Sequence, residues 1–434
     1  MTGRLGQCQS QKGNYMRSIL TNIVSSGLIV AGSLAFGCSA DVQGEGIAAS
    51  SSAISNSPEL YTPKPSEGAK GQIASLQSSH NAADADLIRK LVATPQATWF
   101  TKGTPASVQQ DVNVVVSRAR NQGTPVLVAY NIPFRDCAQF SAGGATNAAD
   151  YAAWIDGFAK GIGDQPAIVI LEPDSLGIIP WFTSYYSPGP DWCQPAEADP
   201  ATAASDRFAM LKAAVARLKQ QPGVKVYLDA THASWLGVGE AAHRLALGGI
   251  DDASGFYLNV SNYQATNNST HYGNWISSCL AYTKLLGNWD AAWCSGQYAP
   301  DATGAYVVNY GDEHVQAVYN DFSWGPKGTT HFLIDTSRNG QGPWTPPADH
   351  PAGDAQDWCN PPGRGTGVLP TLSTGKPLLD AYLWVKLPGE SDGACNRWNP
   401  AGGIDPVRGS IDPAAGVWFD AAALELARNA VPSL

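Results

Sequence analysis

Two stretches, PVLVAYNIPFRDC (residues 125–137) and PAIVILEPDSL (166–176), decide the fold of this chain. Each begins with a short apolar run, 125–130 and 167–171, that has the length and the β-branched content of a buried parallel strand. Between them, residues 151–162 carry apolar side chains at helical spacing. Together the three segments predict one β–α–β unit.

Acidic turn residues follow both predicted strands directly. Asp136 comes after the first strand and Asp174 after the second. In parallel α/β sheets and barrels, residues just beyond the carboxyl ends of the strands face the ligand. Asp136 and Asp174 are therefore the first candidates for a functional pair of carboxylates.

The same alternation continues along the chain. Further strands are predicted at 97–100, 224–228, 255–260, 331–334 and 378–385, and helices at 84–93, 108–120, 202–219, 237–247 and 421–428. With the two strands quoted first, seven strands are predicted. Six of them, all but 97–100, run into polar turns, which contain Asp136, Asp174, Asp229, Asn262, Asp335, and Glu390 with Asp392. This pattern predicts an α/β fold, a (β/α) barrel that is complete or distorted. Any one of these acids could simply cap a helix, but together, beside Trp- and Gly-rich loops, they favour a site.

Composition divides the chain into three parts. Residues 1–38 resemble a signal segment, because Arg17 precedes a broken apolar run that ends at Cys38. Cleavage before Cys38 would leave a lipid-modifiable cysteine, so a cell-surface lipoprotein, a freely secreted protein and a retained anchor all stay open. Residues 39–72 are rich in Ser, Ala, Gly and Pro and predict a flexible tether. Residues 73–434 form the predicted catalytic domain, which includes an unusually long excursion at 264–330.

The cysteines fit an exported protein. Cys8 and Cys38 lie in or at the end of the predicted signal segment, which leaves six: Cys137, Cys193, Cys279, Cys294, Cys359 and Cys395. An even number in an exported chain favours disulfides. Pairing in sequence order closes the shortest loops, so this pairing is predicted.

Charge and motifs narrow the chemistry. The net charge is −10 with no basic cluster, so nucleic acid is not an expected partner. The seven His residues show no metal-ligand spacing, and there is no phosphate loop and no Gly-x-Ser-x-Gly elbow. No metal and no cofactor are therefore expected. Acid–base hydrolysis by carboxylates remains, and 14 Trp and 16 Tyr provide flat faces that suit sugar rings.

Several motifs then match one family in order, from about residue 99 to the C-terminus. They are Tyr130-Asn131-x-Pro133-x-Arg135-Asp136-Cys137, Glu172-Pro173-Asp174, Asp229-Ala230-x-His232, Ser261-Asn262-Tyr263, Asp335-Thr336-Ser337-Arg338-Asn339-Gly340, Trp358-Cys359 and Lys386-Leu387-Pro388-Gly389-Glu390-x-Asp392-Gly393. The chain thus resembles glycoside hydrolase family 6, the cellulases that contain endoglucanases and cellobiohydrolases. The resemblance implies a distorted, TIM-like barrel with fewer than eight strands. It also implies an enzyme that cleaves β-1,4-glucan with inversion of the anomeric configuration.

The resemblance also implies roles at the cleavage point. Asp174 matches the general acid of the family, and Asp136 matches the residue that tunes it. Asp392 matches the proposed general base, whose proton water can relay. Tyr130 matches the tyrosine that presses on the distorted sugar ring.

Substrate binding follows from the same resemblance. Trp358, Lys386 and Glu390 match the subsite on the non-reducing side, and Trp235 matches an aromatic platform on the leaving-group side. Asp229 and His232 belong to the motif just before Trp235, and Asn262 to the Ser-Asn-Tyr motif; all three are further candidates for substrate binding. The resemblance matches the disulfides Cys137–Cys193 and Cys359–Cys395.

Simpler roles stay open for several of these residues. The tryptophans could lie in the core, Lys386 could only pair with Asp335 or Glu390, and His232 could only orient Asp229. Glu172 precedes a proline at a strand end and is expected to be structural.

The mode of attack is less determined by the sequence. Val238 stands where fungal cellobiohydrolases of this family often carry a second tryptophan, which favours internal cleavage, whereas a roof made by 264–330 would favour chain ends. The serine expected in the loop after Asp136 falls at Ser141 or is replaced by Ala142. The prediction is an exported, monomeric, inverting endo-β-1,4-glucanase. A cellobiohydrolase and a non-catalytic glucan-binding protein are the main alternatives, and a hydrolase of xylan or chitin is a weaker third.

Overall fold

The computed structural model describes residues 60–185, 187–287, 290–291, 294–300, 306–308, 327–348, 350, 356–397 and 403–434. The predicted signal segment, with Cys38, and most of the predicted tether lie outside the described residues. Within the described ranges, no helix is both long enough and apolar enough to cross a membrane.

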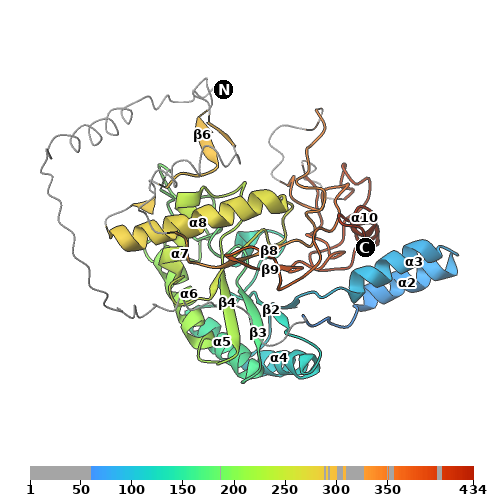
Figure 1. The fold of residues 1–434 in the computed structure, drawn as a ribbon, viewed down its shortest axis with the longest axis horizontal. Helices are drawn as coiled ribbons and strands as arrows, with labels where there is room; N and C mark the ends of the chain where they lie inside the picture. The colour runs from blue at the N-terminus through green and yellow to red at the C-terminus, as the bar shows by residue number, and fades with distance from the viewer. Residues whose placement is uncertain are drawn as a thin grey trace, which may run out of the picture. The chain divides into compact units, whose positions relative to one another are not determined.

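Seven parallel strands form the central sheet, in the order β1-β2-β3-β4-β5-β8-β9 (Figure 1). They are β1 (Thr98–Phe100), β2 (Val126–Ala129), β3 (Ala167–Leu171), β4 (Val224–Asp229), β5 (Gly255–Leu258), β8 (Phe332–Asp335) and β9 (Leu379–Leu383). Ala129 lies opposite Leu171, and Leu171 opposite Leu228. The register therefore brings the turns after these strands to the same edge of the sheet.

The sheet curls until its two outer strands approach each other. The Ala97 N–H, just before β1, donates to the Trp384 carbonyl at 3.0 Å, and Trp99 Nε1 donates to the Val385 carbonyl at 2.7 Å. The enclosed side chains are apolar or aromatic, among them Val128, Ile170, Tyr257, Leu333 and Leu383. The prediction of a distorted barrel with fewer than eight strands is confirmed.

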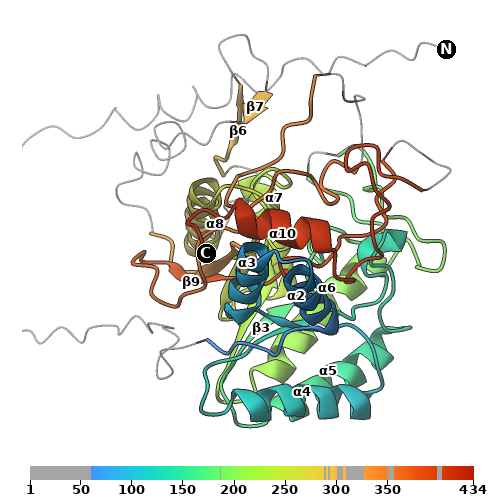
Figure 2. The same cartoon turned by 90° about the vertical axis from the view of Figure 1, so that its right-hand side faces the viewer.

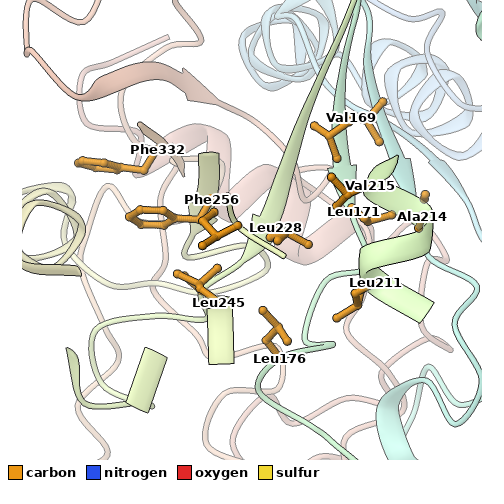
Figure 3. Packing of buried hydrophobic residues seen from close by; sticks show 14 of the residues in the cluster. Val169, Leu171, Leu176, Leu211, Ala214, Val215, Leu228, Leu245, Phe256 and Phe332 are labelled. Atoms are coloured by element: carbon orange, nitrogen blue, oxygen red, sulfur yellow. The ribbon is translucent and has the colours of Figure 1, made fainter. Parts of the chain in front are cut away.

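Helices cover the outside of this sheet. They are α4 (Pro105–Ala119), α5 (Ala148–Ile162), α6 (Ala203–Leu218), α7 (Val238–Gly248) and α8 (Thr266–Leu286). Figure 3 shows the apolar layer beneath them, where side chains of the strands, such as Leu228 and Phe256, meet side chains of α6 and α7, such as Leu211 and Leu245. A Cβ at Gly157 of α5 would lie 2.2 Å from the Pro105 carbonyl oxygen, so glycine permits the close approach of α4 and α5.

The predicted tether ends earlier than expected. Helix α2 (Glu67–Ser78) begins inside the range 39–72, where Ser66 caps it by accepting the Ala69 N–H. The Tyr61 N–H, farther upstream, bonds to the Thr124 carbonyl at 3.0 Å. Residues 60–72 therefore belong to the folded domain, and this part of the tether prediction is wrong. A Ser-, Gly- and Pro-rich composition concealed a capped helix.

Helix α2 lies beside α3 (Ala82–Ala93), and both contact α10 (Asp420–Arg428), as Figure 2 shows. Ile88 and Leu91 of α3 pack with Ala423 and Ala427 of α10 around Trp384. Buried Gln72 of α2 donates to the Asp420 carbonyl at 2.8 Å. The first and last helices of the domain thus close over the residue that follows β9.

The excursion at 264–330 is also more regular than expected. Its first part is the 21-residue helix α8, which packs on α7 and against β8 as an ordinary crossover helix. Strands β6 (Tyr298–Pro300) and β7 (Tyr306–Val308) form a separate antiparallel pair. Residues 288–289, 292–293, 301–305 and 309–326 of this segment lie outside the described residues.

The sequential disulfide pairing is confirmed. Cys137 bonds to Cys193, Cys279 to Cys294, and Cys359 to Cys395. Such bonds fit a protein exported to an oxidising compartment.

Candidate active site

The turns after four neighbouring strands hold residues in the left-handed backbone region. The φ angles are +58° at Asp136, +52° at Glu172, +65° at Asp174, +58° at Thr231 and +58° at Ser261. Such conformations cost non-glycine residues roughly 1–3 kcal/mol each and gather at functional sites. This edge of the barrel is therefore the candidate active site.

Asp174 is the most strongly perturbed acid at this edge. Its carboxyl is largely shielded from water, and burial raises its pKa well above the ordinary value. The negative charges of Asp229, Asp136 and Asp392 raise it further, and Lys386 opposes them only in part. A carboxyl held protonated in this way can donate a proton at neutral pH.

Asp136 lies on the adjacent turn. Its Oδ2 accepts the Ser141 backbone N–H at 2.6 Å, and burial raises its pKa to about 6 despite this bond and the charge of Arg135. Ser141 thus reaches Asp136 through its main chain. The disulfide from Cys137 to Cys193 links this turn to the loop that follows Asp174.

Tyr130, at the end of β2, lies beneath the same turn. Its ring meets Trp99 edge-on with centroids 5.4 Å apart, and the Arg135 guanidinium carbon lies 4.7 Å from its centroid. Burial and the charges of Asp174 and Asp136 raise its pKa well above the usual range. Its ring is therefore fixed beside both acids and stays neutral.

Asp229, at the end of β4, is held by main-chain donors. It accepts the N–H groups of Thr231 at 2.9 Å and Leu176 at 3.3 Å, while burial raises its pKa to about 6. His232 accepts the Ser234 N–H at 3.2 Å, so Asp229 takes its orientation from the main chain. Burial lowers the pKa of His232 to about 4, which leaves its ring neutral at pH 7.

Asp392, beyond β9, is surrounded by cations and a hydroxyl donor, unlike the three acids above. Arg338 Nη1 donates to both of its oxygens at 2.8 Å, Lys386 Nζ lies 3.4 Å from Oδ1, and the Tyr263 hydroxyl donates to Oδ2 at 3.2 Å. Burial alone would raise the pKa of Asp392, but Arg338 and Lys386 outweigh it and hold the pKa below the usual value. Asp392 is therefore a buried, ionised carboxylate.

Two further acids organise the turns from below. Glu172 is fully buried and accepts the N–H groups of Asn131 at 2.8 Å and Ile132 at 3.0 Å, which confirms its structural role. Asp335 accepts four backbone N–H groups, those of Ser261, Ser337, Val385 and Lys386. Asp335 thereby joins the turns after β5, β8 and β9.

The two candidate platforms are half-buried, and Trp235 also packs against the main hydrophobic core. The Trp235 ring passes over Gly177, where a Cβ would lie 2.6 Å from Cη2. Gln297 Nε2 donates to the carbonyls of Ala233 and Leu236 on either side of Trp235. Trp358 lies 6.2 Å from the ring of Phe140, on the loop that follows Asp136.

The remaining candidates lie near Asp392. Lys386 Nζ donates to the Ser391 carbonyl at 3.1 Å, and its ion partner is Asp392. The alternative pairing with the side chain of Asp335 or Glu390 is therefore wrong. Burial raises the pKa of Glu390 although Lys386 lowers it. Asn262 Oδ1 accepts the Tyr263 N–H at 3.1 Å.

Sequence reasoning missed two arginines that hold the site. Arg338 was part of a matched motif but had no assigned role, and it is the main ion partner of Asp392. Arg207 is buried on α6 and donates to the carbonyls of Pro133, Ser175 and Ile178, which ties the turns after β2 and β3 together. Its position on the apolar face of the predicted helix 202–219 was the available signal.

This barrel therefore carries a group of buried carboxylates at the carboxyl edge of its strands. The chain belongs to glycosyl hydrolases family 6, whose family model matches residues 55–430. Endoglucanase A of Cellulomonas fimi is 37% identical over 352 residues, which cover 81% of this chain and 58% of that protein. The chain thus spans less than two thirds of this relative. A probable 1,4-β-D-glucan cellobiohydrolase C of Aspergillus fumigatus is 32% identical over 71% of this chain and 62% of its own length.

A solved structure gives the same fold. An endoglucanase of Mycobacterium tuberculosis, in complex with methyl-cellobiosyl-4-deoxy-4-thio-β-D-cellobioside, aligns with a TM-score of 0.60 at 31% identity. The match covers 87% of this chain and 98% of that one.

Proposed function

We propose that this protein is an inverting endo-β-1,4-glucanase that hydrolyses internal bonds of cellulose-type glucans. The observation that carries the proposal is the division of charge at one edge of the barrel. Asp174 is held protonated by burial and by neighbouring carboxylates, whereas Arg338 and Lys386 keep Asp392 ionised. Inverting glycosidases need one acid in each of these states.

In the proposed reaction, Asp174 gives its proton to the glycosidic oxygen as the bond to the anomeric carbon breaks. Water attacks that carbon from the opposite face, and its proton passes to Asp392, directly or through a second water. The low pKa of Asp392 keeps it ionised and able to accept this proton, although as a weak base. Asp136 and the ionised carboxylates stabilise the positive charge that develops on the sugar ring, and Tyr130 presses on that ring.

Substrate residues are proposed on both sides of the cleavage point. Trp358 would stack on a sugar of the non-reducing side, with Lys386 and Glu390 as hydrogen-bonding partners. Trp235 would stack on the leaving-group side. His232, Asp229 and Asn262 are the further proposed contacts, and the neutral state of His232 leaves it able to donate one hydrogen bond and accept another.

Three observations support internal cleavage over chain-end attack. The endoglucanases among the relatives, from Cellulomonas fimi and two Streptomyces species, are 31–37% identical to this chain. Val238 is a buried residue at the start of α7, packed by Gly296, and offers no platform beyond Trp235. Helix α8 packs on the outer helical layer, so this part of 264–330 forms no roof.

The test follows viscosity against reducing ends during hydrolysis of a soluble, substituted β-1,4-glucan. A steep fall in viscosity with few new ends is expected. A slow fall would contradict internal cleavage and support the cellobiohydrolase alternative. No new ends would support the non-catalytic glucan-binding alternative. Proton NMR of the first product should show the α-anomer, and a β-anomer would contradict inversion.

We also propose that the protein is exported and acts as a monomer, either secreted or anchored through a lipid on Cys38. The three disulfides support export. Mass spectrometry of the mature N-terminus distinguishes a lipidated Cys38 from a free end, and sedimentation equilibrium tests the monomer.

A further inference from the structure

Two buried carboxyl groups face each other behind the Asp392 turn. Asp405 and Asp412 are 0% and 2% exposed, and an oxygen of one lies within 4.8 Å of an oxygen of the other. Asp405 Oδ1 accepts Arg397 Nε at 2.9 Å, and Asp412 Oδ2 accepts Asn360 Nδ2 at 2.8 Å. Their remaining oxygens, Oδ2 and Oδ1, have no hydrogen-bond partner in the part of the chain that the structure describes.

Among the described residues, one cation, Arg397, forms an ion pair with this pair of carboxyl groups. Arg397 forms an ion pair with Asp405 in which both side chains are fully buried. The Arg408 backbone N–H reaches Asp405 Oδ1 at 3.4 Å, but its guanidinium pairs with Glu425. The nearby Cys395 sulfur is in the disulfide with Cys359 and cannot ionise. Two ionised carboxylates would repel each other here, whereas one proton between them supplies the missing hydrogen bond.

Asp405 is connected to the segment around Trp358 through Arg397. The Arg397 guanidinium, which is bonded to Asp405, also donates to the carbonyls of Gln356 and Cys359, each at 2.7 Å. These carbonyls lie on either side of Trp358 in the sequence.

Asp412 is connected to Asp392 through Asn360, which donates to Asp412 from its side chain and bonds to Asp392 as well. The Asn360 N–H donates to Asp392 Oδ2 at 3.0 Å, and Asn360 Oδ1 accepts the Asp392 N–H at 2.8 Å. The pair therefore lies at the junction of the proposed platform and the proposed base.

We propose that Asp405 and Asp412 share one proton, and that the neutral carboxyl so formed is a positioning group for Trp358 and Asp392. Loss of this proton then weakens glucan binding on the non-reducing side. The glucan half of this inference rests on the proposed function, whereas the shared proton does not. Burial raises the pKa of Asp412 to about 6, so the proton is lost between mildly acidic and mildly alkaline pH.

Thermal unfolding tests the shared proton without any substrate. In Asp412→Asn, the amide is permanently neutral, can donate to Asp405 Oδ2, and still accepts from Asn360. Between pH 5 and pH 8, we expect the midpoint of the wild-type protein to fall by about 2 °C more than that of D412N. The matched control, Asp111→Asn on the exposed face of α4, should follow the wild-type protein.

Two unfolding results would overturn the shared proton. One is equal pH dependence in the wild-type protein and D412N, and the other is a D412N that melts well below the wild-type protein at pH 5. A cation between the carboxyls would also overturn it. That cation would show as a rise in the wild-type midpoint on adding calcium chloride at pH 8 that is absent in D412N.

Binding of cellohexaose, followed by tryptophan fluorescence, tests the positioning role. The background is Asp174→Asn, which removes turnover and the titration of Asp174. From pH 5 to pH 8, its affinity should fall by about fivefold more than that of Asp174→Asn/Asp412→Asn, as expected when one hydrogen bond is lost, and the comparison cancels the titration of Asp136 and Asp229, which both proteins retain. An equal fall in both proteins would overturn the positioning role. No binding at either pH would overturn it together with the proposed function, while the unfolding data still decide about the proton.

Discussion

Carboxylates at the same edge of one barrel have pKa values shifted in opposite directions. Asp174, Asp136 and Asp229 follow β3, β2 and β4, and none of them forms an ion pair with a described residue, so burial raises their pKa values. Asp392, beyond β9, is equally enclosed, yet Arg338 and Lys386 lower its pKa. Burial alone therefore raises the pKa of an acid at this edge, and the pKa of buried Asp392 falls below its ordinary value because the fold brings two cations to it.

The largest effect is expected when the proposed proton donor, Asp174, is removed. Asp174→Ala should lower kcat on unactivated β-1,4-glucan by about 10²–10⁴-fold, because no other raised carboxyl takes its position. Cello-oligosaccharide binding should persist, as measured by tryptophan fluorescence. Asp111→Asn, on the exposed face of α4, is the control. A rate near that of the wild-type protein would refute the role of Asp174 as the acid.

Removing the cation should make Asp392 resemble the other acids. In Arg338→Met, the pKa of Asp392 should rise, so the acid limb of the kcat profile should move to higher pH. The free energy of unfolding should drop by about 3–5 kcal/mol because a buried carboxylate loses its partner. In the wild-type protein, the depressed pKa of Asp392 contributes stability above its unfolded value, and this stability is lost as the pH falls through the folded value.

Arg338→Lys separates charge from geometry, because it keeps the cation and loses the planar fork. It should restore much of the acid limb. An acid limb that stays in place in Arg338→Met would show that ionised Asp392 is not needed for turnover.

Glu172 provides a second comparison with Asp174. Its pKa is also raised, but its side chain is fully buried and accepts main-chain N–H groups. Burial raises its pKa from 4.5 to about 7. The stability linked to its protonation is fully present below pH 4.5 and is lost as the pH rises through about 7, which amounts to about 3 kcal/mol.

Chemical denaturation of Glu172→Gln at pH 5 and pH 8 measures this contribution. The variant should lose less than about 1 kcal/mol at pH 5, where the amide replaces a neutral carboxyl of the same shape and its oxygen can still accept the N–H groups of Asn131 and Ile132, and its stability should depend less on pH. Turnover per folded molecule should fall far less than in Asp174→Ala. A comparable fall would contradict a purely structural role.

The smallest effects are expected at the aromatic platforms. Trp235→Ala and Trp358→Ala should each weaken binding by about 0.5–1.5 kcal/mol, or roughly 2–10-fold in KM, with kcat changed less. The corresponding Phe variants should recover part of the loss. If neither Ala variant changes KM for cellohexaose, the two rings do not contact substrate.

The elements with strong periodicity could be predicted from the sequence. The strand Ala167–Leu171 was predicted to the residue, and α5, α6 and α7 to within a few residues at each end. Helix α2 was missed because Ile73 and Leu76 are its only large apolar residues, and its stability comes from the Ser66 cap and from contacts with α3 and α10. The long excursion hid α8 for a similar reason, since its buried residues include Ser, Thr and Gly.

For the site, the acids at strand ends and the sequential cysteine pairing could be predicted from the sequence, because strand period and loop length are local properties. The pKa shifts of these acids could not be predicted, since they depend on residues that lie far away in the chain and meet only in the folded protein. Asp392 is ionised because Arg338, 54 positions earlier, lies 2.8 Å away. The pKa of Asp174 is raised because its carboxyl is buried, because Asp229 and Asp136 lie near it, and because no cation pairs with it among the described residues. A pKa is set by distance and burial, which no local pattern encodes.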